Sequence, residues 1–110
     1  MKGSNLGEFE ELVLLTIGAL ANDAYGVSIK DFISEKTKRT PSIGALHSAL
    51  SRLEDKGFIK AEIGEATKIR GGRRKKYYQI TIAGKSVLRA TKEIRSELYG
   101  MIPNLNFVLA

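Results

Sequence analysis

A run of positive charge between residues 68 and 76 is the clearest candidate for binding chemistry in this chain. Six of its nine residues are cationic: Lys68, Arg70, Arg73, Arg74, Lys75 and Lys76. The chain holds 18 Lys and Arg against 12 Asp and Glu, so the net charge of +6 resides in this one run. Cations that neutralise phosphates release condensed counterions, and the run therefore favours a polyanionic partner. A solvated charge run without a partner is the alternative interpretation.

The segment 40–56 is predicted to be a helix with two unlike sides. Apolar residues at helical spacing would face a core: Ile43, Leu46, Leu50 and Leu53. Thr40 fits an N-cap, Pro41 fits the first helical position, and Gly57 fits a left-handed residue after the helix. The opposite side carries small or polar residues: Gly44, Ala45, Ser48 and Arg52. Such a side can approach a groove floor while the arginine reaches a base edge or a phosphate, whereas a plain surface helix is the alternative.

Two more residues of this helix are candidates for contact with a phosphate backbone. Ser42 stands near the predicted start, where free backbone N–H groups also favour phosphate, and His47 directly precedes Ser48. We predict no catalytic residues and no metal site, because the chain has one histidine, no cysteine and scattered carboxylates. Gly71 and Gly72 lack the spacing and the following helix of a nucleotide-binding loop, and no cofactor is expected.

Hydrophobic periodicity predicts the elements that must position these residues. A first helix covers residues 6–21, Asn22 and Asp23 supply turn and cap, and a second helix runs from Tyr25 to Thr37. Alternating residues predict strands at 59–63 and 77–81, so the basic run becomes the turn of a hairpin. The fold class is mainly α with a small antiparallel β-hairpin, in the order of a winged helix-turn-helix. In that fold the third helix enters the major groove and the hairpin grips the flanking backbone, which predicts double-stranded DNA as the partner.

The last predicted helix is long for so small a domain. Thr81 caps it, and its apolar stripe exceeds the surface that three short helices and a hairpin can cover. We therefore predict a homodimer through Phe9, Val87, Leu88, Thr91, Ile94, Leu98 and Ile102. Folding of this helix back onto the first helix is the alternative. The expected division is a DNA-binding domain at 1–81 and a dimerisation helix with a tail at 82–110.

Several short segments resemble the PadR family of transcriptional regulators. They are LGEFE at 6–10, AYG at 24–26, IGAL at 43–46, SRLEDKG at 51–57 and GGRRKKYY at 71–78, followed by Thr81 and by Ala83 with Gly84. The match runs from Leu6 to about Leu98 and keeps the order and spacing of these motifs. The resemblance implies a dimeric repressor on a roughly palindromic operator, released in some members by a small-molecule effector such as a phenolic acid or a drug.

Two features depart from the family pattern, and the absence of tryptophan bears on ligand binding. His47 stands where the family usually has a tyrosine, which puts a tyrosine-specific phosphate contact in doubt. One helix and a tail follow the hairpin, so the chain resembles the short subgroup. Some members of that subgroup hold flat aromatic ligands with a tryptophan, and this chain has none, so that pocket chemistry does not carry over.

Two other classes of partner fit the same basic loop. An RNA-binding winged helix would use the same basic loop without a dimer, and a protein-interaction module would bind an acidic partner through it.

The apolar run 12–21 is too short to span a membrane, and acidic residues precede it where a signal peptide has cations. We therefore expect a cytoplasmic protein that does not act at a membrane.

Overall fold

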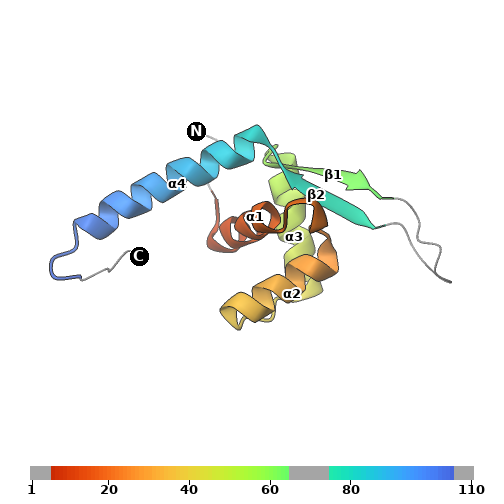
Figure 1. The fold of residues 1–110 in the computed structure, drawn as a ribbon, viewed down its shortest axis with the longest axis horizontal. Helices are drawn as coiled ribbons and strands as arrows, with labels where there is room; N and C mark the ends of the chain where they lie inside the picture. The colour runs from red at the N-terminus through yellow and green to blue at the C-terminus, as the bar shows by residue number, and fades with distance from the viewer. Residues whose placement is uncertain (1–5, 65–74, 106–110) are drawn as a thin grey trace.

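The computed structural model describes residues 6–64 and 75–105, and within them it contains four α-helices and one two-stranded sheet. The elements in chain order are α1 (Glu8–Leu20), the short 3-10 helix η1 (Ala21–Asp23), α2 (Gly26–Thr37), α3 (Ile43–Asp55), β1 (Ile59–Ile63), β2 (Lys76–Ile80) and α4 (Ile82–Gly100). Three helices gather into a compact body, the hairpin projects from one end, and α4 extends in the opposite direction (Figure 1). This is the predicted winged helix-turn-helix order, and the fold class is confirmed.

α1 is the central helix of the core. It packs against α2, α3 and β2, and its residues Val13, Leu14 and Ile17 are completely or almost completely buried. The other buried apolar residues come from α2, α3, the two strands and the connections beside them: Ala24, Ile29, Ile33, Leu46, Ala49, Leu50, Leu53, Phe58, Ile59 and Tyr78. The remaining elements are therefore held mainly by the burial of apolar area around one helix.

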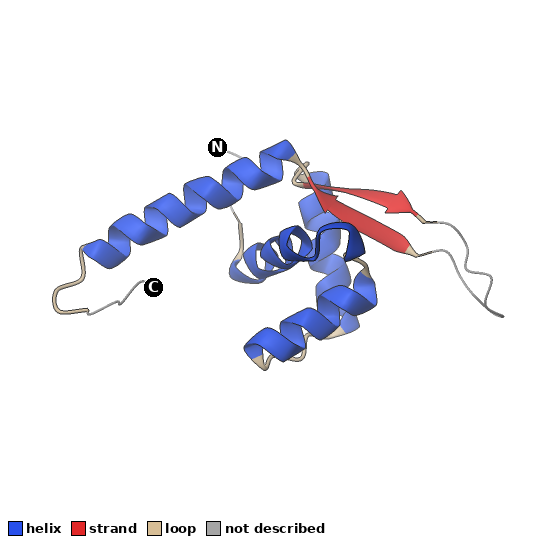
Figure 2. Ribbon diagram, in the orientation of Figure 1, coloured by secondary structure: helices blue, strands red, loops and turns tan. Residues whose placement is uncertain are grey.

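The hairpin is an antiparallel pair in which Ile59 lies opposite Ile80 and Ile63 lies opposite Lys76. Two strands alone are marginally stable, and their inner ends accordingly pack on the helices. Ile59 and Tyr78 are buried, whereas Ile63 at the outer end is exposed. The strands thus leave the body as a projecting ribbon (Figure 2), which confirms the predicted hairpin with its second strand one residue earlier than expected.

The start of α4 is fixed to the turn between α3 and β1. As predicted, Thr81 is the N-cap: its Oγ1 accepts a hydrogen bond from the Gly84 N–H at 3.0 Å and donates one to the Gly57 carbonyl at 2.7 Å. Gly84 is the buried residue of this helix, and a Cβ on it would collide with the Phe58 carbonyl oxygen. Close packing at one glycine therefore orients a helix whose remaining length lies on the surface.

The predicted caps of α2 and α3 were wrong by two or three residues. η1 confirms the turn at Asn22 and Asp23, but the N-cap of α2 is Tyr25, whose N–H donates to Ser28 Oγ at 2.9 Å. α3 begins at Ile43, so neither Thr40 nor Pro41 belongs to that helix. Gly57 follows α3 with φ of 81°, which confirms the predicted left-handed residue.

Candidate nucleic-acid interface

The amino-terminal turn of α3 is held in place by Ser42. Its Oγ accepts a hydrogen bond from the Ala45 N–H at 3.0 Å, and its carbonyl accepts one from the Leu46 N–H at 3.0 Å. Ser42 replaces the predicted Thr40 because it stands in extended conformation directly before the first helical residue, where its side chain reaches a free N–H. The first turn of the candidate recognition helix therefore has a defined start and direction.

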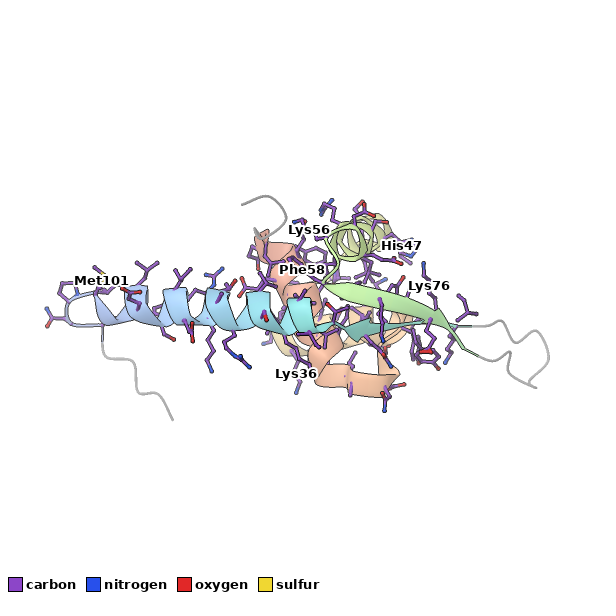
Figure 3. All side chains as sticks on the ribbon, turned by 90° about the horizontal axis from the view of Figure 1, so that it is seen from above. Lys36, His47, Lys56, Phe58, Lys76 and Met101 are labelled. Carbon is purple, nitrogen blue, oxygen red and sulfur yellow. The ribbon has the colours of Figure 1, made fainter. Side chains whose placement is uncertain are left out.

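The predicted contact face of α3 lies on the surface. Ser42, Gly44, Ala45, His47, Ser48 and Arg52 are all exposed. A Cβ added to Gly44 would meet no atom within 4 Å, so open space adjoins the helix there. Figure 3 shows the labelled His47 toward the hairpin end of the molecule, where Lys76 also lies, with Met101 at the far end of α4. The sequence placed Ile43 in the buried stripe, and this was wrong, because Ile43 is 60% exposed.

Arg52 is engaged with a carboxylate on α1. Its Nε donates to Glu10 Oε2 at 2.6 Å, while Lys56 Nζ donates to Glu10 Oε1 at 2.8 Å. The Glu10 side chain is only 8% exposed, whereas that of Arg52 is 53% exposed. The structure thus places Arg52 where it pairs with α1 and also reaches solvent.

Glu10 was missed by the sequence-based prediction, although a signal was present. Positions 10, 13, 14 and 17 follow helical spacing, so Glu10 occupies the buried stripe of α1 together with Val13, Leu14 and Ile17. Burial raises the pKa of Glu10, but hydrogen bonds from Lys56, Arg52 and the Gly7 N–H outweigh burial and leave this pKa below its ordinary value. The carboxylate therefore stays ionised and joins α1 to α3.

The neighbouring carboxylates of α1 reach other parts of the chain. Glu8 accepts a hydrogen bond from Arg39 Nη1 at 2.7 Å, and Arg39 also lies over the Phe9 ring. Glu11 accepts one from Arg95 Nη2 of α4 at 2.7 Å. The first turn of α1 consequently carries ionic contacts to the α2–α3 connection, to α3 and to α4.

An aromatic cluster connects the hairpin to the start of α2. Tyr25 and Tyr77 pack edge to face with ring centroids 5.5 Å apart, and Lys75 Nζ lies 4.1 Å from the Tyr25 ring centroid. The Tyr78 N–H donates to the Ala24 carbonyl at 2.8 Å. Tyr25 is half-buried in this cluster. The cluster ties the hairpin to the start of α2.

Two of the six predicted cations of the basic run can be placed. Lys75 and Lys76 are exposed at the outer end of β2, and Lys76 Nζ lies 5.8 Å from the Tyr78 ring centroid. Lys68, Arg70, Arg73 and Arg74 fall outside the described residues. The described part of the hairpin thus presents positive charge at its outer end.

Comparison with known proteins assigns the family. The family model described as "Transcriptional regulator PadR-like family" matches residues 13–90. The chain belongs to the PadR-like family of transcriptional regulators. It is also 37% identical over 84 residues to a protein of Lysinibacillus sphaericus, an alignment that covers 74% of this chain and 72% of that protein.

Solved structures agree with this PadR-like fold. A PadR-like transcription factor from Bacteroides fragilis superposes with a TM-score of 0.76 at 24% identity, over 89% of each chain. A transcriptional regulator from Clostridium thermocellum superposes with a TM-score of 0.69 at 28% identity, over 89% of this chain and 92% of that one. The resemblance seen in the sequence motifs is confirmed.

The predicted dimer residues of this PadR-like regulator divide into two groups along the chain. Phe9, Val87 and Leu88 are half-buried and pack against the core of their own chain, and Thr91 is also half-buried. Ile94, Leu98 and Ile102 are exposed by about half or more, and Met101 is 69% exposed beside them. The first half of α4 therefore rests on its own domain, while the second half carries apolar side chains in solvent.

A groove of about 460 Å³ runs between α1 and α4. Its lining residues are Glu11, Leu15, Leu88, Arg89, Lys92, Arg95, Ser96 and Tyr99. Leu15, Leu88 and Tyr99 give it apolar walls, while the pair of Glu11 with Arg95 lies within it.

Metal-binding and membrane-spanning features were not found in the described residues. No group of three His, Asp or Glu side chains within residues 6–64 and 75–105 lies close enough to hold a metal ion. Among the helices of that same part of the chain, none has the length and apolar character needed to cross a membrane.

Proposed function

We propose that this PadR-like regulator binds double-stranded DNA sequence-specifically as a homodimer and represses transcription from a pseudo-palindromic operator. The observation that carries the proposal is the joint exposure of a small-faced α3 and a basic hairpin at one end of the molecule. The strand that follows α3 leads directly into the basic run, as a duplex-binding winged helix requires. The exposed apolar half of α4 at the other end supports the homodimer.

Each candidate residue has a proposed contact. Gly44, Ala45 and Ser48 let α3 approach the major groove, and Arg52 reads or approaches it. Ser42 and His47 meet the backbone beside the helix start. The hairpin contacts phosphates or the minor groove with Arg73, Arg74 and Lys75, supported by Lys68, Arg70 and Lys76.

We propose the dimer contact on α4, with residues 1–81 as the DNA-binding domain and 82–110 as the dimerisation part. Ile94 and Leu98 are exposed apolar side chains in the second half of α4, and Ile102 follows the end of that helix. Covering them with a second α4 would remove this apolar area from water. A two-fold dimer would set two copies of α3 against two half-sites of opposite orientation.

The groove between α1 and α4 is the place where we propose that a small-molecule effector would bind. Its apolar walls and the cations Arg89 and Lys92 at its lining suit an apolar molecule with an anionic group. A ligand there would lie beside the helix that we assign to the dimer, and so could change the separation of the two copies of α3.

Selection of bound sites from a random duplex pool, followed by inspection for inverted repeats, tests the DNA-binding proposal. The expected result is two half-sites about one helical turn apart, roughly 10 base pairs from centre to centre. Binding of the selected site should exceed binding of random duplex by at least about a thousandfold at physiological salt. Equal binding of both, or preference for structured RNA by a monomer, would overturn the proposal.

A further inference from the structure

Ile43 differs from the other apolar residues of α3. Leu46, Leu50 and Leu53 are at most 3% exposed, whereas Ile43 is 60% exposed. Its side chain therefore contributes little to the core. This side chain is therefore available to a partner outside the chain.

The chain presents Ile43 in a defined orientation. It is the first helical residue after Ser42, whose side chain and carbonyl bind the next turn through Ala45 and Leu46. The capped helix start therefore fixes where the Ile43 Cβ lies, and its β-branched side chain has restricted χ1 freedom.

The surroundings of Ile43 permit a close approach of another surface. Ser42, Gly44 and Ala45 are exposed and small, and open space adjoins Gly44. Ile43 is the large side chain among these four consecutive residues. A surface that approaches this turn closely would therefore contact the Ile43 side chain.

We propose that Ile43 is a specificity-determining residue that contacts the C5-methyl group of a thymine in each operator half-site. The inference rests on the proposed function, in which α3 lies in the major groove. On the floor of that groove, the base pairs present hydrogen-bond donors and acceptors, and the thymine methyl is the apolar group among them. The amino-terminal residues of a recognition helix are those that contact base edges.

The experiment replaces thymines of the selected operator by deoxyuridine, one position of the half-site at a time. This exchange removes only the methyl group and leaves base pairing intact. Removal of one buried methyl should weaken wild-type binding about fourfold at one or two positions of each half-site and leave the other positions unchanged. The Ile43→Ala variant should bind the thymine and deoxyuridine operators equally at those positions.

Ile82→Ala is the matched control. Ile82 is also the first residue of a helix, also follows a side-chain N-cap, and is 84% exposed. Ile82→Ala should keep the full deoxyuridine effect, and Ile43→Val should keep most of it. The salt dependence of binding should be the same in all variants, because Ile43 neutralises no phosphate.

Three results decide the outcome. If wild-type protein binds the selected operator tightly but shows no weaker binding at any deoxyuridine, the role of Ile43 is refuted while DNA binding stands. If the weakening persists undiminished in Ile43→Ala, another residue contacts the methyl group and the inference is likewise refuted. Failure of the proposed function itself would appear earlier, as wild-type protein that does not distinguish the unmodified operator from random duplex.

Discussion

Glu10 carries a carboxylate on the buried side of α1. Arg52 of α3 and Lys56 directly after that helix both pair with it, and the Gly7 N–H donates to it at 3.2 Å. Arg52 and Lys56 both retain contact with solvent, so this is a buried anion with partly hydrated partners. The arrangement lets a charged side chain stabilise the packing of α1 on α3 without isolating three charges from water.

Glu10→Gln should lower the free energy of unfolding by about 1.5–3 kcal/mol, the range for hydrogen bonds to a charged group. The decrease stays below that of a fully buried ion pair because Arg52 and Lys56 can be rehydrated. Urea denaturation followed by circular dichroism measures it. Glu8→Gln is the control, since Glu8 and Arg39 form an exposed pair whose removal should cost at most about 1 kcal/mol. An equal decrease in both variants would contradict the proposed role of Glu10.

The same residue predicts a pH dependence of stability. The folded pKa of Glu10 lies below its ordinary value of 4.5, so the folded state binds this proton less readily than the unfolded state. Its contribution to stability is complete above the ordinary pKa and is lost as the pH falls through the folded pKa. The stability difference between wild type and Glu10→Gln should therefore shrink as the pH is lowered below about 4.5 in a denaturation series. A difference that is constant over the whole acid range would contradict this prediction.

What the sequence could reveal about single residues depended on how far away their partners are. Glu8, Glu10 and Glu11 look alike in the sequence, and their different roles come from Arg39, Arg52, Lys56 and Arg95, which are 31 to 84 residues away. Thr40 and Ser42 are both good N-caps, and only the backbone conformation selected the second. Ile43 fits the helical stripe by spacing, but it lies at the helix end, where no neighbouring element covers it.

At the scale of elements, hydrophobic periods and turn residues were sufficient to predict the order and types of the helices and strands. Most of their bounds differ from the expected ones by one to three residues, because helix ends are set by caps rather than by period. The hairpin was predictable because apolar and polar residues alternate in both strands that flank the basic run. Its attachment through Tyr25 and Tyr77 was not, since that contact joins residues 52 positions apart in the sequence.

Gly84→Ala should destabilise the contact between α4 and the rest of the domain. A Cβ at Gly84 would collide with the backbone of Phe58, which cannot move aside as a flexible side chain could. We expect a decrease of about 1–3 kcal/mol in the free energy of unfolding, measured by thermal or urea denaturation. Gly44→Ala is the matched control, because nothing lies within 4 Å and alanine favours a helix by up to about 1 kcal/mol. Equal stability of Gly84→Ala and wild type would show that α4 is not fixed at this point.

Removal of cations from the hairpin should change the salt dependence of DNA binding. If Arg73 and Arg74 each neutralise one phosphate, the double alanine variant should bind all DNA sequences more weakly and keep its order of preference among them. The slope of log affinity against log salt should become shallower by about 0.9 for each phosphate that is no longer neutralised. Titrations at several salt concentrations measure both effects.

Lys92→Ala, on α4, is the control for the removal of one positive charge and should leave the slope unchanged. An unaltered slope in the Arg73 and Arg74 variant would remove the hairpin from the DNA interface.

At the scale of the whole molecule, the sequence predicted an excess of apolar surface on the last helix. In the structure this surface lies on the second half of α4. The part of α4 near Gly84 is anchored, its middle reaches α1 through Arg95 and Glu11, and its end extends beyond the domain. The sequence left two interpretations of this helix, a dimer contact and folding back onto the first helix. The helix does contact its own α1, and it still has Ile94 and Leu98 in solvent, where a dimer contact would need them. One chain therefore uses a single helix both to complete its domain and to offer an apolar surface.

Leu98→Glu should separate the proposed dimer into folded monomers. Leu98 is 56% exposed within its own chain, so the substitution should change its free energy of unfolding little, while a charge on the proposed contact opposes association. Sedimentation should then give the mass of one chain, and circular dichroism should keep the helical signal. Ser86→Glu adds the same charge on an exposed residue of α4 outside the predicted stripe and should remain dimeric.

DNA binding by the Leu98→Glu variant tests whether the proposed dimer is the form that binds the operator. If each copy of α3 reads one half-site, the Leu98→Glu monomer should bind the palindromic operator and an isolated half-site with similar affinity, and wild type should strongly prefer the palindrome. Gel-shift titration of both DNAs with both proteins measures the difference. A Leu98→Glu protein that sediments as one chain yet keeps the wild-type preference would mean that α4 pairing is not what aligns the two half-sites.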